Sequence, residues 1–234
     1  MKKSIALLLM LMGMLQASGL GFNINNKDLE FEGNIDMGYK GSTKYSINAI
    51  YLRTTRSLNY EDIDDSKVGD YLDDLIHRKI GLGSQVVDDL TKTLLLVHDN
   101  FGSISFNASN KLSSASGVVL TFGIGAVFER RFTRKYIATP VSGKVTLHLP
   151  FDGSIPPLTL STKISYAPSV LSFFNAKQYL EYRFEADMEV IPDVHVYGGH
   201  KNIDTTYKTI DNTIYLTYTY NLVNDWYGGI RITF

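Results

Sequence analysis

The chain has 234 residues, no cysteine and a formal net charge of -1 at pH 7. The absence of cysteine excludes disulfides, thiolate metal sites and a cysteine nucleophile, and the near-neutral charge gives no sign of a nucleic-acid partner. Nineteen glycines, fifteen tyrosines and twelve phenylalanines are typical of an all-β protein rich in aromatic residues.

The N-terminal segment has the pattern of a secretory signal peptide. Two lysines precede an apolar run from Ile5 to Leu15, and small residues follow up to Gly19. This run is shorter than the roughly twenty residues that a membrane-spanning helix needs. We therefore expect cleavage after Gly19 and a single mature domain over residues 20–234. No second long apolar run follows, which leaves a soluble periplasmic domain or a β-barrel.

Alternation of apolar and polar residues is the main evidence for the fold, because it places successive side chains on opposite faces of a strand. It begins at residues 29–39 and is strongest at residues 180–190, where five charged residues share one face. Further strands are predicted at residues 45–53, 78–87, 101–108, 118–129, 144–151, 158–166 and 213–234. If nearly all the apolar faces point toward lipid, the pattern predicts an antiparallel up-and-down transmembrane β-barrel with a polar interior.

A soluble β-sandwich is the alternative, since its outer face could also carry the charges. Tyrosines near the strand ends favour the barrel. So does the final strand, in which Ile230, Ile232 and Phe234 alternate with polar residues up to the last position. These three residues are predicted to be the signal read by the barrel assembly machinery of the outer membrane.

Such barrels close with an even number of strands. We therefore interpret residues 213–234 as one strand with a bulge at Asn224-Asp225. With the segment between the turn at residues 191–193 and the loop at residues 202–211 counted as a further strand, this gives ten strands, and eight or twelve stay open. Short periplasmic turns are predicted at residues 152–156 and 191–193, and longer external loops at residues 130–141, 167–177 and 202–211. Residues 54–77 are predicted to be an acidic periplasmic loop with a helical turn. An EF-hand cation site is rejected there because Lys67 stands where the pattern needs glycine.

Charged residues on the polar faces are predicted to lie in the lumen. They are Glu30, Glu32, Asp36, Lys144, Lys163, Glu181, Arg183, Glu185, Asp187, Glu189 and Arg231. Ionised groups in a narrow interior are costly unless they are paired or hydrated. Two arrangements stay open: the charges interlock and fill a rigid barrel, or surplus carboxylates line a narrow cation-preferring pore. Strand closure is expected to bring Glu32 or Asp36 to Arg231.

A basic cluster follows the strand at residues 118–129 and consists of Arg130, Arg131, Arg134 and Lys135. Arginine binds phosphate in a bidentate manner. We therefore expect this segment to contact lipopolysaccharide at the cell surface, with a solvated loop as the alternative.

The sequence shows no clear arrangement of catalytic residues. The five histidines show no metal-ligand spacing, so neither a metal nor another cofactor is expected. His148 or His195 could reach Ser161 or Ser165 across strands, but no local pattern marks a nucleophile. We predict a protein that is not an enzyme, acting as a structural element or narrow, porin-like pore. An outer-membrane lipid hydrolase or acyltransferase is one alternative, and a surface-binding protein that uses its external loops is another.

The last third of the chain resembles the YfaZ family of outer-membrane proteins. The resemblance rests on the segments Tyr166–Phe173, Tyr179–Tyr182, Val190–Asp193 and Val196–Gly199 and covers about residues 166–234. Where the family has Gly-Tyr-Arg, this chain has Gly199-His200-Lys201. The resemblance implies an exported barrel in the cell outer membrane, without an established activity. We expect it to be a monomer.

Overall fold

The structure is a computed structural model that describes residues 18–25, 27–57, 96–112, 117–131, 134–149, 156–211 and 214–234. The chain divides into two compact units, Met1–Arg53 with Asn100–Phe234, and Thr54–Asp99. Most of the described residues belong to the first unit, which holds the candidate site. The predicted turn at residues 152–156, the acidic segment after Ser57, the strand at residues 78–87 and residues 1–17 of the predicted signal peptide lie outside the described residues.

Nearly all of the described residues form antiparallel strands, which confirms the all-β prediction. The strands are β1 (Gly19–Ile24), β2 (Asp28–Lys40), β3 (Thr43–Ser57), β4 (Leu96–Lys111), β5 (Val118–Arg131), β6 (Arg134–Ala138), β7 (Val141–Leu149), β8 (Leu158–Ala167), β9 (Ser172–Phe174), β10 (Ala176–Ile191), β11 (Val194–Asp211) and β12 (Ile214–Thr233). A short 3-10 helix, η2 (Ser169–Leu171), precedes β9. Among the described residues, no helix has the length and apolar character to span a membrane.

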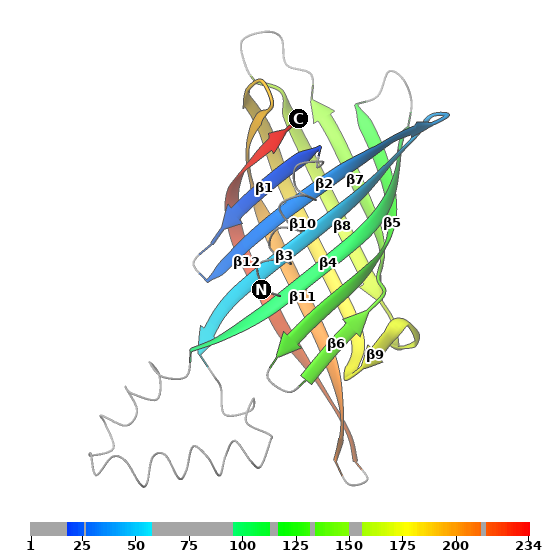
Figure 1. Cartoon of the computed structure of the whole chain (residues 1–234), viewed down its shortest axis with the longest axis vertical. Coiled ribbons are helices and arrows are strands. Elements are labelled where there is room, and N and C mark those ends of the chain that lie inside the picture. The colour runs from blue at the N-terminus through cyan, green and yellow to red at the C-terminus, as the bar shows by residue number, and fades with distance from the viewer. Residues whose placement is uncertain are drawn as a thin grey trace, which may run out of the picture. The chain divides into compact units, whose positions relative to one another are not determined.

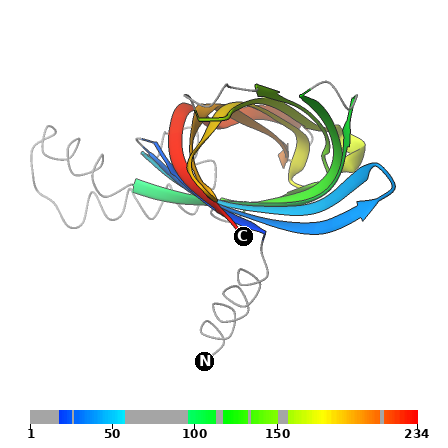
Figure 2. The ribbon, with the colours of Figure 1, turned by 90° about the horizontal axis from the view of Figure 1, so that it is seen from above.

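The strands form one sheet that closes on itself. The strands follow one another around the sheet in the order β1, β2, β3, β4, β5, β7, β8, β10, β11 and β12, and β6 also pairs with β5. β1 pairs with β12 in antiparallel register from Gly19↔Thr233 to Ile24↔Gly228, which closes the ring. Figure 1 shows the strands crossing obliquely, and Figure 2 shows the resulting ring from above. The fold is therefore an up-and-down β-barrel, as the alternation predicts.

The barrel has ten strand positions, although twelve strands occur in the sheet. β6 and β7 share one position because both pair with β5 in the same register, at Val127↔Ala138 and Ile124↔Val141. Pro140 lies between β6 and β7 and separates them, because proline has no N–H to donate to the sheet. Its carbonyl nevertheless accepts a hydrogen bond from Gly125 N of β5 at 2.9 Å. β9 lies in the connection between β8 and β10 and pairs with β6. The predicted strand number is confirmed.

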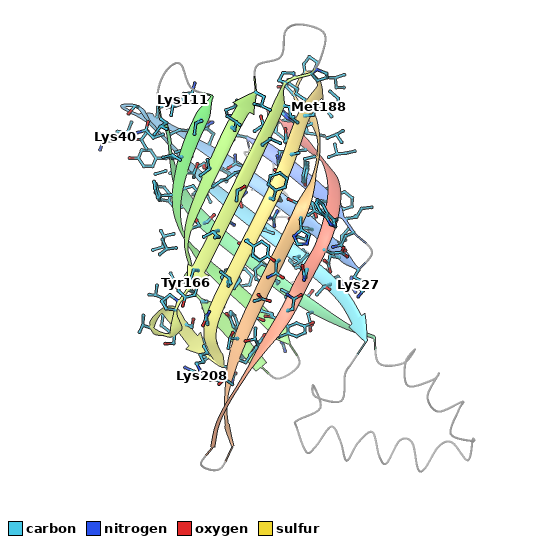
Figure 3. All side chains as sticks on the ribbon, turned by 180° about the vertical axis from the view of Figure 1, so that it is seen from behind. Lys27, Lys40, Lys111, Tyr166, Met188 and Lys208 are labelled. Atoms are coloured by element: carbon cyan, nitrogen blue, oxygen red, sulfur yellow. The ribbon has the colours of Figure 1, made fainter. Side chains whose placement is uncertain are left out.

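The two ends of the barrel differ in the elements that they carry. The terminal end is where β1 begins and β12 finishes, and it also carries the β2–β3 and β10–β11 turns. The β10–β11 connection is the tight turn predicted at residues 191–193, and Asp193 adopts a φ of 66° in it. The distal end carries the long β11–β12 hairpin. In Figure 3, Lys40 and Lys111 lie near the terminal end and Lys208 lies near the distal end.

Several predicted boundaries are wrong. Residues 202–211 are not a loop, because β11 continues to Asp211 and pairs with β12. Residues 130–141 are mainly the tight β5–β6 hairpin rather than a long loop. The bulge in the last strand falls at Leu222, where the register changes between Ile203↔Val223 and Asp204↔Asn221, and not at Asn224-Asp225. The first strand, β1, was missed because its six residues directly follow the apolar segment that resembles a signal peptide.

The two faces of the barrel wall differ sharply. Large apolar side chains lie exposed on the exterior of nearly every strand position, for example Phe22, Phe31, Ile104, Phe122, Val145, Ile164, Phe184, Val196 and Ile230. Charged side chains on the alternate positions are buried inside, and Glu30 and Lys201 are both 0% exposed. The barrel therefore has a polar interior and an apolar exterior, the reverse of a protein whose apolar residues form a core in water.

Candidate functional site inside the barrel

A network of ion pairs crosses the middle of the lumen. Arg183 on β10 reaches across to β2, where it donates to Glu30 at 2.8 Å and to Glu32 at 2.7 Å. Lys201 on β11 donates to the second oxygen of Glu30 at 2.9 Å. Asn23 on β1 donates to Glu30 at 2.8 Å. Each of these carboxylates is therefore compensated by charge and by hydrogen bonds, which a buried ionised group requires.

Arg231 on β12 forms the second centre of the network. It lies 3.1 Å from Glu32, 3.1 Å from Glu185 and 2.6 Å from Asp187. Glu32, one of the two partners proposed from strand closure, thus bridges Arg183 and Arg231. His195 Nδ1 lies 2.7 Å from the Asp187 carboxylate. One guanidinium therefore joins strands β2, β10 and β12.

Tyrosine hydroxyls and rings complete the network. Tyr227 donates to Glu185 at 3.0 Å, and Tyr179 donates to Glu181 at 3.2 Å. The Arg231 guanidinium lies 4.3 Å from the centre of the Tyr197 ring, and Lys201 Nζ lies 5.2 Å from the centre of the Tyr227 ring. The negative faces of these rings stabilise the cations in addition to the carboxylates.

An apolar layer lies in the lumen on the distal side of the ion pairs. It contains Leu52, Phe101, Val127, Tyr136, Ala138, Ala167, Ala176, Tyr179, Ile203, Tyr207, Leu222 and Val223. The rings of Phe101 and Tyr179 stack across the lumen with their centres 6.2 Å apart. On β10, Tyr179 directly precedes the charged positions that begin at Glu181. The interior thus changes from apolar packing to ion pairs along a single strand.

A polar cavity of about 910 Å³ lies on the other side of the ion pairs. Serine, threonine and asparagine side chains from β3, β4, β5, β7 and β8 line it, and Arg183, Glu185 and Arg231 form part of its inner wall. Residues at strand ends, including Gly19 and Thr233, also line it, so the cavity extends to the terminal end. Ion pairs and apolar side chains lie between this cavity and the distal end.

The predicted lumen charges have four different environments. Glu30, Glu32, Glu181, Arg183, Glu185, Asp187 and Arg231 belong to the network, and Lys163 joins it through Glu181 at 2.9 Å. Asp36 instead pairs with Lys44. Glu189 accepts a hydrogen bond from Asp193 N at the β10–β11 turn. Lys144 lines the cavity and has no ion pair among the described residues.

The basic cluster lies in the β5–β6 hairpin at the distal end. Arg130 pairs across the hairpin with Lys135, and Arg131 pairs with Arg134. Arg130 and Lys135 are exposed, and both alternate with interior positions, so their side chains lie on the exterior. Of the side chains of Arg131 and Arg134 the structure describes nothing.

The three predicted assembly-signal residues lie at the terminal end. Ile230 and Ile232 are exposed on the exterior of β12, and Phe234 follows the end of that strand. Phe234 N donates to the Ser18 carbonyl at 3.1 Å. This hydrogen bond extends the contact between the start and the end of the barrel by one residue beyond the last pair, Gly19↔Thr233.

The histidines do not form a catalytic arrangement with serine in the described part of the chain. His148 Nδ1 lies 3.0 Å from Thr159 Oγ1, and His195 faces Asp187. Ser161 and Ser165 are interior residues of β8. Within the described ranges, no group of three or more histidine, aspartate and glutamate side chains is arranged to hold a metal ion.

Several residues of the network were missed from the sequence. They are Asn23, Tyr179, His195, Tyr197, Lys201 and Tyr227, none of which is among the predicted lumen charges. Each of these residues lies between exterior residues of its strand. This alternation is the feature of the sequence that could have placed their side chains in the interior. Tyrosine and asparagine were not recognised as interior residues because neither carries a charge at neutral pH.

A comparison with known protein families finds no match to this chain, and a search of curated proteins finds none either. The resemblance to the YfaZ family therefore stays a prediction from the residues.

Proposed function

We propose that this protein is a β-barrel of the bacterial outer membrane with a closed lumen, and that it acts as a structural or binding element rather than as an open pore. The observation that carries this proposal is the band of exposed apolar side chains around the barrel. In water, so many exposed large apolar residues would promote aggregation. In a bilayer they face hydrocarbon, and the pairing of β1 with β12 closes the sheet into a ring.

An aromatic row supports a membrane boundary near the distal end. Tyr182, His200 and Trp226 lie on neighbouring strands, with ring centres 6.2 Å and 5.3 Å apart. Beyond this row the exterior of β11 and β12 becomes polar, and Asn221 donates hydrogen bonds to Asn202 and Asp204. Along the tilted strand β10, the distance from Tyr182 to Val190 corresponds to about 20 Å of bilayer thickness. Aromatic residues bordering an apolar band of this height are typical of membrane β-barrels.

The orientation follows from the connections. Short turns are usual on the periplasmic side and longer elements outside, so we place the terminal end in the periplasm and the β11–β12 hairpin outside. This orientation also places Ser57, at the distal end of β3, outside, so it disagrees with the sequence prediction that the acidic segment after β3 is periplasmic. We further propose that an N-terminal signal peptide is removed and that the barrel assembly machinery recognises Phe234. It follows that the polar cavity opens to the periplasm and that the apolar layer closes the external end.

The interlocked charges favour a closed barrel over a cation-preferring pore. Each carboxylate of the network already contacts a basic side chain, so these groups are not free to replace the hydration shell of a passing ion.

The proposal is tested by following the full-length chain in a Gram-negative host and after purification in detergent. We expect the protein in the outer-membrane fraction, with a gel mobility that changes on boiling. In planar bilayers we expect no stepwise single-channel currents. A soluble periplasmic protein would contradict the membrane assignment, whereas stable cation-selective channels would contradict only the closed lumen.

We also propose that the β5–β6 hairpin contacts lipopolysaccharide phosphates through Arg130 and Lys135. Both side chains lie beyond the apolar band on the proposed external side, where phosphates are found. Replacing Arg130, Arg131, Arg134 and Lys135 by serine is expected to reduce the lipopolysaccharide that co-purifies with the barrel. An unchanged amount of co-purifying lipopolysaccharide would show that the hairpin is merely solvated.

A further inference from the structure

Lys144 on β7 differs from the other basic residues of the lumen. Lys163, Arg183, Lys201 and Arg231 each contact a carboxylate within 3.1 Å. None of the ion pairs among the described residues includes Lys144, although Glu185 acts on its charge from a longer distance. An ammonium group inside a protein is costly unless a counter-ion or water compensates it. Lys144 is therefore available to an anion that enters the cavity.

The charges that line the cavity are mainly positive. The basic lining residues are Lys44, Lys111, Lys144, Lys163, Arg183 and Arg231, against two acidic residues, Glu32 and Glu185. The other carboxylates of the network, Glu30, Glu181 and Asp187, do not line the cavity and lie behind the arginines and lysines. A bound anion would thus meet the cationic side of the network.

The remaining wall consists largely of hydroxyl and amide groups. Ser142 and Thr146 lie on either side of Lys144 on the same face of β7, and Ser105, Asn107 and Ser161 lie on other strands around the cavity. Hydroxyl and amide groups can both donate and accept hydrogen bonds, as the hydroxyl groups of a sugar do. A volume of about 910 Å³ is within the range of small-molecule sites, roughly 300–1,000 Å³.

We propose that this cavity binds a small hydroxylated anion of the sugar-phosphate class. Lys144 Nζ contacts the anionic group, and the surrounding serine, threonine and asparagine side chains bind the hydroxyl groups. The ligand enters from the terminal end, because the ion pairs and the apolar layer close the other side. The site goes beyond the proposed function and does not depend on the membrane location, since it lies within the barrel itself.

Glucose 6-phosphate is the probe, and it is titrated into the purified, folded barrel in detergent by isothermal titration calorimetry. Glucose and inorganic phosphate serve as the two partial ligands. We expect saturable binding of glucose 6-phosphate, at least tenfold tighter than that of either partial ligand. Lys144→Gln should weaken this binding at least tenfold, and Lys144→Arg should retain it.

The matched control is Lys208→Gln, which removes one positive charge from an exposed position of β11. It should bind glucose 6-phosphate as the unmodified protein does. Each variant is first shown to be folded by its heat-dependent gel mobility. No saturable binding at millimolar glucose 6-phosphate, or equal binding by Lys144→Gln, overturns the proposal. Phosphate that binds as tightly as glucose 6-phosphate overturns the assignment to hydroxylated ligands.

Discussion

Replacing Arg183 by methionine is expected to destabilise the barrel by about 3–5 kcal/mol, the usual effect of removing one partner from a buried ion pair. Arg183 contacts both Glu30 and Glu32, and its side chain is 7% exposed. Without the guanidinium, Lys201 still compensates Glu30, but Glu32 keeps only Arg231, which it shares with Glu185 and Asp187. The measurement is reversible denaturant unfolding of the barrel in detergent or lipid vesicles.

Two controls separate electrostatics from lost packing. Arg130→Met removes an exposed arginine from the β5–β6 hairpin and should change the free energy of unfolding by less than about 0.5 kcal/mol. The double variant Arg183→Met with Glu32→Gln removes the carboxylate that the first change leaves under-compensated. It should be more stable than Arg183→Met alone. If it is not, charge compensation is not the reason that Arg183 stabilises the barrel.

Replacing Ile124 by arginine should reduce the free energy of unfolding from a bilayer by about 2–4 kcal/mol, the cost of an arginine at the bilayer midplane on the lipid face of a barrel. Ile124 lies on the exterior of β5 and is 54% exposed. On a surface that faces water, the same change would have little effect or would improve solubility. The experiment therefore reports directly on what surrounds the barrel.

The matched control is Thr206→Arg on the exterior of β11, beyond the aromatic row. It places the same side chain on the same kind of surface but outside the proposed hydrocarbon region, and should cost about 0–1 kcal/mol. Equal and small effects at both positions would show that the exterior apolar residues face water. The membrane assignment would then be wrong, although the fold would stand.

Alternation was sufficient to predict the fold because the charged and apolar faces of β2 and β10 differ so clearly. It failed in the part of β11 after Asn202, which was predicted to be a loop. There the exterior side chains are polar, and the apolar residues Ile203 and Tyr207 lie on the interior face, so the apolar exterior of the other strands does not continue. The short strand β1 was hidden because it directly follows the predicted signal peptide. The bulge at Leu222 could not be located from the sequence, since a register change is defined only by the partner strand.

The residues of the ion-pair network were largely predictable, but their partners were not. Arg183 and Glu30 are 153 positions apart in the chain, and their contact depends on the register of every strand pair around the ring. Alternation shows that both face inward, whereas their height in the barrel follows from strand tilt and from bulges. For the same reason the separation of the lumen into an apolar layer, an ion-pair layer and a cavity has no counterpart in the local sequence pattern.

The seam between β1 and β12 has a consequence for biogenesis. Glu32 and Arg231 meet across it although they are 199 positions apart, and the other basic partners of Glu30 and Glu32 lie on β10 and β11. The carboxylates of β2 therefore find their partners only late in synthesis, and Glu32 meets Arg231 only after the last strand has been delivered. Until then the early strands must keep these charges hydrated, which argues against their insertion one hairpin at a time. Pairings between such distant segments form slowly because of the entropy of closing long loops. Maturation is therefore expected to depend on a catalyst that holds the open sheet until its two ends meet.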